Sequence, residues 1–255
     1  MPQLLARYEN KYLVPRSSVD GIREVARSFC LPDAYGQDGC YEVNSLYCDT
    51  EDFRTARDTM CGQKIRFKAR MRTYGFEPDQ PVYLELKRRV GTTIVKGRAL
   101  VSRDVARGIA TDTPPPPEGY QALKVGHETD MLDYRAVHDA IGLRPACWVR
   151  YRREAWASAF PDGARLTFDT YLESQPPEYD RLFEPDPLEW VAVSWDGPPV
   201  VLELKFNGAY PKWMRHIVQA WRLQRISFPK YVQSLNAVTN LPWGRSEHAQ
   251  RGVLL

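Results

Sequence analysis

The chain has 255 residues, and its 35 lysines and arginines are nearly balanced by 32 aspartates and glutamates, for a formal net charge of +3. This balance argues against a generally basic surface, so we expect no nucleic-acid partner. No stretch approaches the roughly 20 apolar residues of a membrane helix, and the N-terminus lacks a secretory signal pattern, so we expect no membrane segment in this chain. The five cysteines lack metal-ligand spacing, which favours reduced thiols and a cytoplasmic location.

Strand-like segments with helices towards both ends of the chain predict an α+β fold, as one large domain or two small ones. Serine capping and apolar spacing predict a helix over 17–30. A short polar helix or turn is expected over 51–60, a mostly helical stretch ends near 142, and Pro211 suits the start of a last helix. Alternating side chains predict strands over 43–49, 64–74, 82–89, 93–101, 147–155, 164–171, 188–196 and 199–206.

Several of these strands carry charged residues on one face only, because residues two apart in a strand share a face. The alternation groups the charged residues by strand as Lys64, Arg66, Lys68, Arg70 and Arg72; Glu85 and Lys87; Lys96 and Arg98; Arg150 and Arg152; Arg165 and Asp169; and Glu203 and Lys205. A single charged face fits the solvated side of an antiparallel sheet. Repetition over six strands favours a surface that binds a polyanion, since neighbouring like charges repel one another.

If such a sheet closes, its basic faces line a tunnel and its apolar faces pack outward against helices, the inverse of an ordinary small barrel. Arginine and lysine side chains suit phosphate oxygens. A carboxylate among them would repel phosphate unless a hard divalent cation lies between the two. Glu203 is therefore the first candidate metal ligand and Glu85 the second. Ion pairing to a neighbouring lysine or arginine is the alternative for both.

Short segments spread over nearly the whole chain carry a family resemblance. In order they are RYENKYLV (7–14), NSLYCDT (44–50), ARMRTYG (69–75), YLELKRR (83–89), IVKGRA (94–99), VRYRREAW (149–156), RLTFD (165–169), VLELKF (201–206) and SFPKY (227–231). This ordered set resembles the polyphosphate polymerase (VTC) domain of the triphosphate tunnel metalloenzyme, or CYTH-like, superfamily. The resemblance implies a single domain over residues 1–255, built as a closed antiparallel eight-stranded β-barrel with flanking helices.

The resemblance also implies an activity. The γ-phosphate of ATP or another nucleoside triphosphate would be transferred to a growing inorganic polyphosphate chain, with Mn²⁺ or Mg²⁺ as cofactor. The metal would be held by Glu203, with Glu85 as the further candidate. The implied phosphate-binding residues are Lys11, Arg70, Arg72, Lys87, Lys96, Arg98, Arg150, Arg152, Arg165, Lys205 and Lys230.

Two alternatives stay open within the same fold: a triphosphatase or short-chain polyphosphatase, and a non-catalytic polyphosphate-binding module. Segment 7–12 contains Glu9 and Lys11 but lacks the denser ExExK signature of the hydrolase and cyclase branch, which favours the polymerase. None of the histidines has a nucleophile setting. For Tyr74 and Tyr83 we favour packing in the core or at the rim over contact with a nucleotide.

Overall fold

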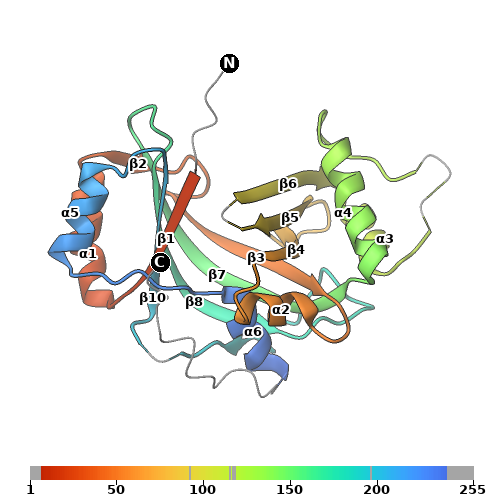
Figure 1. Cartoon of the computed structure of the whole chain (residues 1–255). Helices are drawn as coiled ribbons and strands as arrows, with labels where there is room; N and C mark the ends of the chain where they lie inside the picture. Colours follow the sequence, from red (N-terminus) through yellow and green to blue (C-terminus); the bar gives the residue numbers. More distant parts are fainter. Residues whose placement is uncertain (1–6, 92, 115, 117–118, 196, 240–255) are drawn as a thin grey trace.

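The structure, a computed structural model, describes residues 7–239 except 92, 115, 117–118 and 196 (Figure 1). Residues 1–6 and 240–255 of the implied domain lie outside the described residues. The strands are β1 (Arg7–Val14), β2 (Cys30–Pro32), β3 (Cys40–Asp49), β4 (Ile65–Thr73), β5 (Val82–Val90), β6 (Thr93–Val101), β7 (Arg144–Ser158), β8 (Arg165–Gln175), β9 (Val191–Ala192) and β10 (Val200–Asn207). The helices are α1 (Arg16–Arg27), α2 (Arg54–Met60), α3 (Arg103–Ala110), α4 (Glu128–Ile141), α5 (Lys212–Ala220) and α6 (Lys230–Thr239).

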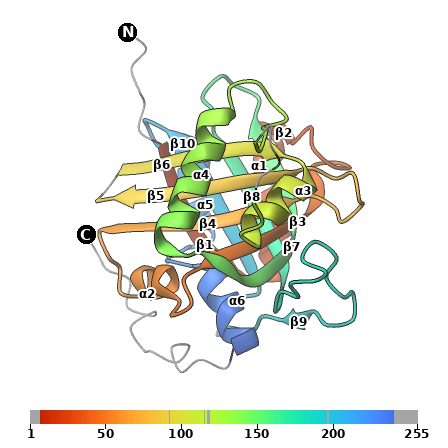
Figure 2. The same ribbon diagram turned by 90° about the vertical axis from the view of Figure 1, so that its right-hand side faces the viewer.

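The strands form one antiparallel sheet whose hydrogen-bonded path runs β1-β10-β8-β7-β3-β4-β5-β6, with β2 and β9 attached to β7 and β8. The predicted α+β class is confirmed. The implied closed eight-stranded barrel is not, because β1 and β6 end the path and do not pair with each other among the described residues. The sheet nevertheless folds back on itself, so that β4, β5 and β6 pass in front of β1, β8 and β10 (Figure 2).

Side chains bridge the two halves of the sheet where the backbone does not. Lys87 Nζ on β5 lies 3.8 Å from Glu9 Oε2 on β1. Paired strands lie about 4.8 Å apart, whereas two long side chains that meet end to end require a wider separation of their backbones. The inner face of the curved sheet is therefore spanned by charged groups between strands that are distant in the hydrogen-bonded path.

Helices cover the outer face, where the alternating apolar residues lie. Leu46 and Leu84 pack with Met131 and Tyr134 of α4 in one buried cluster. A second cluster joins β1, β8 and β10 to α1 and α5. The third cluster lies on the inner side, where Tyr231 of α6 stacks on Tyr47 with ring centroids 4.6 Å apart. Helix α6 therefore fills one part of the inner face and places its first residue, Lys230, beside the charged part.

The predicted strand over 188–196 is largely absent, because only β9 pairs there. Leu188 is 91% exposed and Val191 is 48% exposed, whereas Val193 is buried in the third cluster, so the apolar side chains of this segment do not share one buried face. The Leu188 N–H instead donates to the Asp186 side chain in a local turn. Among the described residues, no helix has the length and apolar character needed to span a membrane.

The outer packing makes one stability prediction. Leu84 on β5 is 1% exposed beneath α4, whereas Leu132 on α4 is 63% exposed. We expect Leu84→Ala to lower the free energy of unfolding by about 2–5 kcal/mol, because it leaves a cavity in the packed layer. Leu132→Ala should change it by no more than about 0.5 kcal/mol. Urea unfolding of both variants checks this, and equal losses would contradict the assignment of outward-facing residues to the core.

Candidate functional site

Charged residues from strands far apart in the sequence meet on the inner face of the sheet. In the β1–β10 pair, Lys11 lies opposite Glu203 and Glu9 lies opposite Lys205. In the β4–β5 pair, Arg70 lies opposite Glu85. Because opposed residues of paired strands project to the same side, each pairing brings cations and a carboxylate together.

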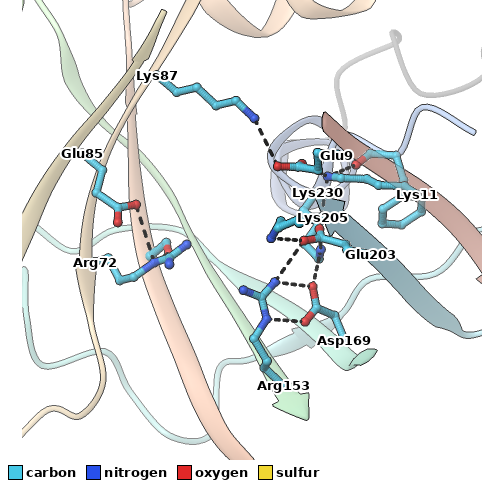
Figure 3. Close-up of polar contacts among 12 residues, drawn as sticks. Glu9, Lys11, Arg72, Glu85, Lys87, Arg153, Asp169, Glu203, Lys205 and Lys230 are labelled. Atoms are coloured by element: carbon cyan, nitrogen blue, oxygen red, sulfur yellow. Dashed lines mark hydrogen bonds and ion pairs between the residues drawn. The ribbon is translucent and has the colours of Figure 1, made fainter. Parts of the chain in front are cut away.

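Glu203 is the centre of the larger cluster (Figure 3). Its Oε2 accepts a hydrogen bond from Lys205 Nζ at 2.7 Å and another from Arg153 Nη2 at 3.4 Å. Its Oε1 accepts from Lys230 Nζ at 2.9 Å and lies 3.3 Å from Lys11 Nζ. The residue is only 4% exposed. A buried carboxylate is thus surrounded by cationic groups from β1, β7, β10 and α6.

Asp169 on β8 extends this cluster. Arg153 donates to both of its oxygens, from Nε and Nη2, each at 2.7 Å. Lys230 Nζ lies 2.6 Å from Asp169 Oδ2. Arg153 and Lys230 therefore bridge the two buried carboxylates, which fixes the relative positions of β7, β8, β10 and the start of α6.

The charges in this cluster hold one another in the ionised state. Burial alone would raise the pKa of Glu203, but Lys205, Lys230 and the other nearby cations lower it well below its usual range. Burial would likewise raise the pKa of Asp169, and the two bridging cations lower it. Burial opposes the charged form of Lys230, yet Asp169 and Glu203 raise its pKa above that of an ordinary lysine.

Glu85 is the centre of a second cluster, on the opposite part of the inner face. Arg70 donates to Glu85 Oε2 through Nε at 2.6 Å, and its Nη1 donates to the Tyr47 hydroxyl at 3.0 Å. Arg98 Nε lies 3.3 Å from Glu85 Oε1, and Arg72 Nε lies 3.8 Å from Oε2. Burial would raise the pKa of Glu85, but its three arginine neighbours lower it to about 2.

Two lysines between these clusters are only weakly compensated. Burial, with repulsion from neighbouring cations such as Lys11, lowers the pKa of Lys68 to about 7. Burial also lowers the pKa of Lys87 to about 8, although Glu9 partly opposes this effect. The inner face therefore carries more positive charge than its carboxylates neutralise, which is the electrostatic property that a polyanion site requires.

Most of the implied phosphate-binding residues lie on this inner face. They are Lys11, Arg70, Arg72, Lys87, Lys96, Arg98, Arg165, Lys205 and Lys230. Lys96 is exposed opposite Lys87, and Arg165 forms an ion pair with Asp33.

Arg150 and Arg152 are not among them, contrary to expectation. They alternate along β7 with Val149 and Tyr151, which pack in the inner cluster with α6, so the two arginines lie on the outer face. Arg150 donates to Glu173 at 2.8 Å and lies over the Trp190 ring. The alternation showed correctly that the two share a face, but it did not show which face.

Arg153 was missed by the sequence analysis. It is the residue on β7 that reaches the carboxylates, and it is 9% exposed. The run RYRRE places arginines on both faces of the strand, so alternation alone could not separate them. The one signal in the sequence was Asp169, a carboxylate on a neighbouring strand; its need for a cation follows from its burial opposite Arg153, which only the structure shows.

Glu203 fits a divalent cation only as a ligand shared with phosphate. Each of its oxygens already contacts two cationic groups. Mg²⁺ in phosphoryl-transfer sites is commonly held by one or two carboxylates together with substrate phosphate oxygens, which also attract lysines. The donor set is therefore compatible with Mn²⁺ or Mg²⁺ bound jointly with a phosphate chain. Glu85 is surrounded by arginines in the same way.

Asp112, His138 and Asp139 form a different group whose ligand atoms lie within 4.8 Å of one another. It lies outside the inner face, at α4 and the segment after α3. Arg144 and Arg135 each lie 2.7 Å from one of its carboxylates. Burial lowers the pKa of His138, which keeps the imidazole neutral and able to act as a ligand. This group could bind a metal, but it is separate from the charged residues of the sheet.

The lowered pKa of Lys68 makes a prediction about pH. Unfolding returns Lys68 to its normal pKa of 10.5, so above about pH 7 the unfolded chain binds more protons than the folded chain. The free energy of unfolding therefore rises with pH in this range, which means that Lys68 destabilises the fold less as the pH rises. Lys68→Met should therefore raise the free energy of unfolding most at and below about pH 7, and this advantage should shrink as the pH rises from about 7 towards 10.5. Urea unfolding at several pH values measures the difference between the two proteins. A difference that does not change with pH would contradict the lowered pKa.

Comparison with known proteins places the chain in a family. Similar solved structures include a proposed adenylate cyclase from Bacillus halodurans, with 14% identity, 88% of this chain and 94% of that chain covered, and a TM-score of 0.48. Another is the PH1819 protein from Pyrococcus horikoshii OT3, with 13% identity, 89% of this chain and 97% of that chain covered, and a TM-score of 0.44. A third is HpAC1 from Hippeastrum, a proposed adenylyl cyclase with a dominant triphosphatase activity. It has 13% identity, 93% of this chain and 99% of that chain covered, and a TM-score of 0.48. No curated protein matches the chain. Residues 6–239 match the VTC domain, and the protein therefore belongs to the VTC domain family.

Proposed function

We propose that the protein is a metal-dependent polyphosphate polymerase that transfers the γ-phosphate of ATP to an inorganic polyphosphate chain on the inner face of the sheet. The observation that carries this proposal is the excess of lysines and arginines around a few buried carboxylates, in a chain of the VTC domain family. A linear polyanion could contact both halves of the folded-back sheet at once. That contact would complete the tunnel which the backbone alone leaves unpaired between β1 and β6.

The inner-face residues perform the alignment that phosphoryl transfer requires. The attacking group, a terminal phosphate oxygen of the chain, is already ionised and needs no strong general base, and in-line transfer depends mainly on positioning and charge stabilisation. Lys11, Lys205 and Lys230 would hold phosphate oxygens beside Glu203, while Arg70 and its neighbours would hold the opposite part of the chain. The transfer breaks the bond between the γ-phosphorus and the bridging oxygen and releases ADP; a divalent metal held by Glu203 and phosphate would neutralise the charge that develops on this leaving group.

The direct test incubates the purified protein with ATP and Mn²⁺ or Mg²⁺ and separates the products on a gel stained for polyphosphate. The proposal expects a ladder of long chains. Free phosphate without any polyphosphate would contradict the polymerase and indicate a triphosphatase. Tight tripolyphosphate binding without any product would replace it with a non-catalytic binding module.

Glu203→Gln tests the metal ligand. The amide keeps the shape of the side chain but loses the charge that a hard cation requires, so we expect metal-dependent turnover to be abolished while tripolyphosphate still binds. Glu173→Gln is the control, because Glu173 pairs with Arg150 on the outer face. A Glu203→Gln protein with near-normal turnover would show that Glu203 is only an ion-pair partner.

Lys87→Gln tests whether phosphate binding depends on the inner face of the sheet. Lys87 reaches across the sheet towards Glu9, and its side chain is 39% exposed, so we expect its loss to be tolerated by the fold. Removing one charge-assisted contact should weaken tripolyphosphate binding by about 1.5–3 kcal/mol in calorimetry without metal. Arg152→Gln, on the outer face, should leave the affinity unchanged. Equal effects of the two substitutions would mean that phosphate binding does not depend on the inner face.

A further inference from the structure

Four tyrosines form a cluster at one end of the inner face. The ring centroids of Tyr35 and Tyr74 are 4.7 Å apart, and those of Tyr35 and Tyr41 are 5.0 Å apart. Tyr74 also lies 5.9 Å from Tyr41 and 6.1 Å from Tyr83, measured between centroids. The rings come from the segment between β2 and β3, the start of β3, the end of β4 and the start of β5.

This tyrosine cluster continues the rows of charged residues. On β4 the inner face passes from Lys68 through Arg70 and Arg72 to Tyr74, because these residues alternate along the strand and its end. On β5, the Tyr83 side chain follows Glu85 on the same face and lies opposite Arg72.

One contact between a ring and an arginine, and one strand pairing, support this continuity. The Arg98 guanidinium lies 3.6 Å from the centroid of the Tyr83 ring while its Nε reaches Glu85. Tyr41 lies opposite Arg153 in the β3–β7 pair. The inner face therefore changes from cationic to aromatic along its length without a break.

The cluster is open rather than sealed. Tyr35 is 46% exposed, and the other three tyrosines are partly buried. A cluster that served only to close a core would bury its rings more completely. The rings of Tyr35 and Tyr41 stand at 81° and those of Tyr35 and Tyr74 at 51°, so they do not stack in a single column. The exposed part of Tyr35 is the ring surface that another planar group can reach.

We propose that the tyrosine cluster is the binding subsite for the base of the nucleoside triphosphate, and this proposal rests on the nucleotide-dependent function proposed above. A nucleoside triphosphate has a planar aromatic base at one end and a chain of phosphates at the other. The inner face offers the matching sequence of surfaces, with tyrosine rings next to Arg72 and Arg98 and then the lysines. Stacking of a base on an aromatic side chain is tolerant of base identity, because every base has a π-face.

The experiment compares ATP with tripolyphosphate, which has no base, on the full-length protein by calorimetry without metal. Tyr35→Leu should weaken ATP binding about fivefold or more, the loss expected for one stacking contact, and leave tripolyphosphate binding unchanged. Tyr35→Phe should bind ATP as the unmodified protein does, because stacking needs the ring and not the hydroxyl. Tyr179→Leu, which removes a 48% exposed tyrosine elsewhere on the chain, is the matched control and should change neither affinity.

The outcomes separate this inference from the proposed function. Unchanged ATP affinity in Tyr35→Leu, with tripolyphosphate still bound, would overturn the base subsite and leave the proposed function intact. An equal loss of ATP and tripolyphosphate affinity would also overturn it, since the ring would then act on the phosphate site as a structural support. Failure of the unmodified protein to bind either ligand would instead overturn the proposed function, and the base subsite with it.

Discussion

The structure depends on mutual charge compensation among groups buried on the inner face of the sheet. Taking a carboxylate out of water is costly unless cations and hydrogen-bond donors replace the water. Glu203 and Asp169 meet this condition only because β1, β7, β8, β10 and α6 all deliver a residue to the same place. The ion pairs therefore act as a positional constraint, since removing one partner would leave the others buried without compensation.

This constraint explains why the apolar residues of the sheet lie on its outer face, beneath the helices. A sheet whose inner side is occupied by charged groups must bury its other side to be stable, and α1, α3, α4 and α5 provide the cover. Where the inner side does become apolar, near Val149 and Tyr151, α6 covers it from within. The same helix supplies Lys230, so one short element both completes the core and completes the charge cluster.

The sequence predicted the charged rows well where a strand carries a regular alternation. On β4, basic residues at every second position could occupy only one face, and the structure places Arg70 and Arg72 together on the inner side. On β7, arginines at 150, 152 and 153 interrupt the alternation, and the choice of face depended on which neighbours packed against helices. Strand β1 was not identified from alternation at all, although the family resemblance did select Lys11 within it.

The sequence by itself determined the α+β class, the period-two separation of charged from apolar residues, and the family, because local periodicity and ordered motifs are properties of the chain alone. Only the tertiary structure decided which side of each strand faces inward, that β1 and β6 do not pair with each other among the described residues, and that the carboxylates are bound by lysines and arginines. It alone also brought Tyr35, Tyr41, Tyr74 and Tyr83 together. These features depend on how the sheet folds back, which joins residues as far apart as Lys11 and Lys230, and no local pattern encodes that curvature.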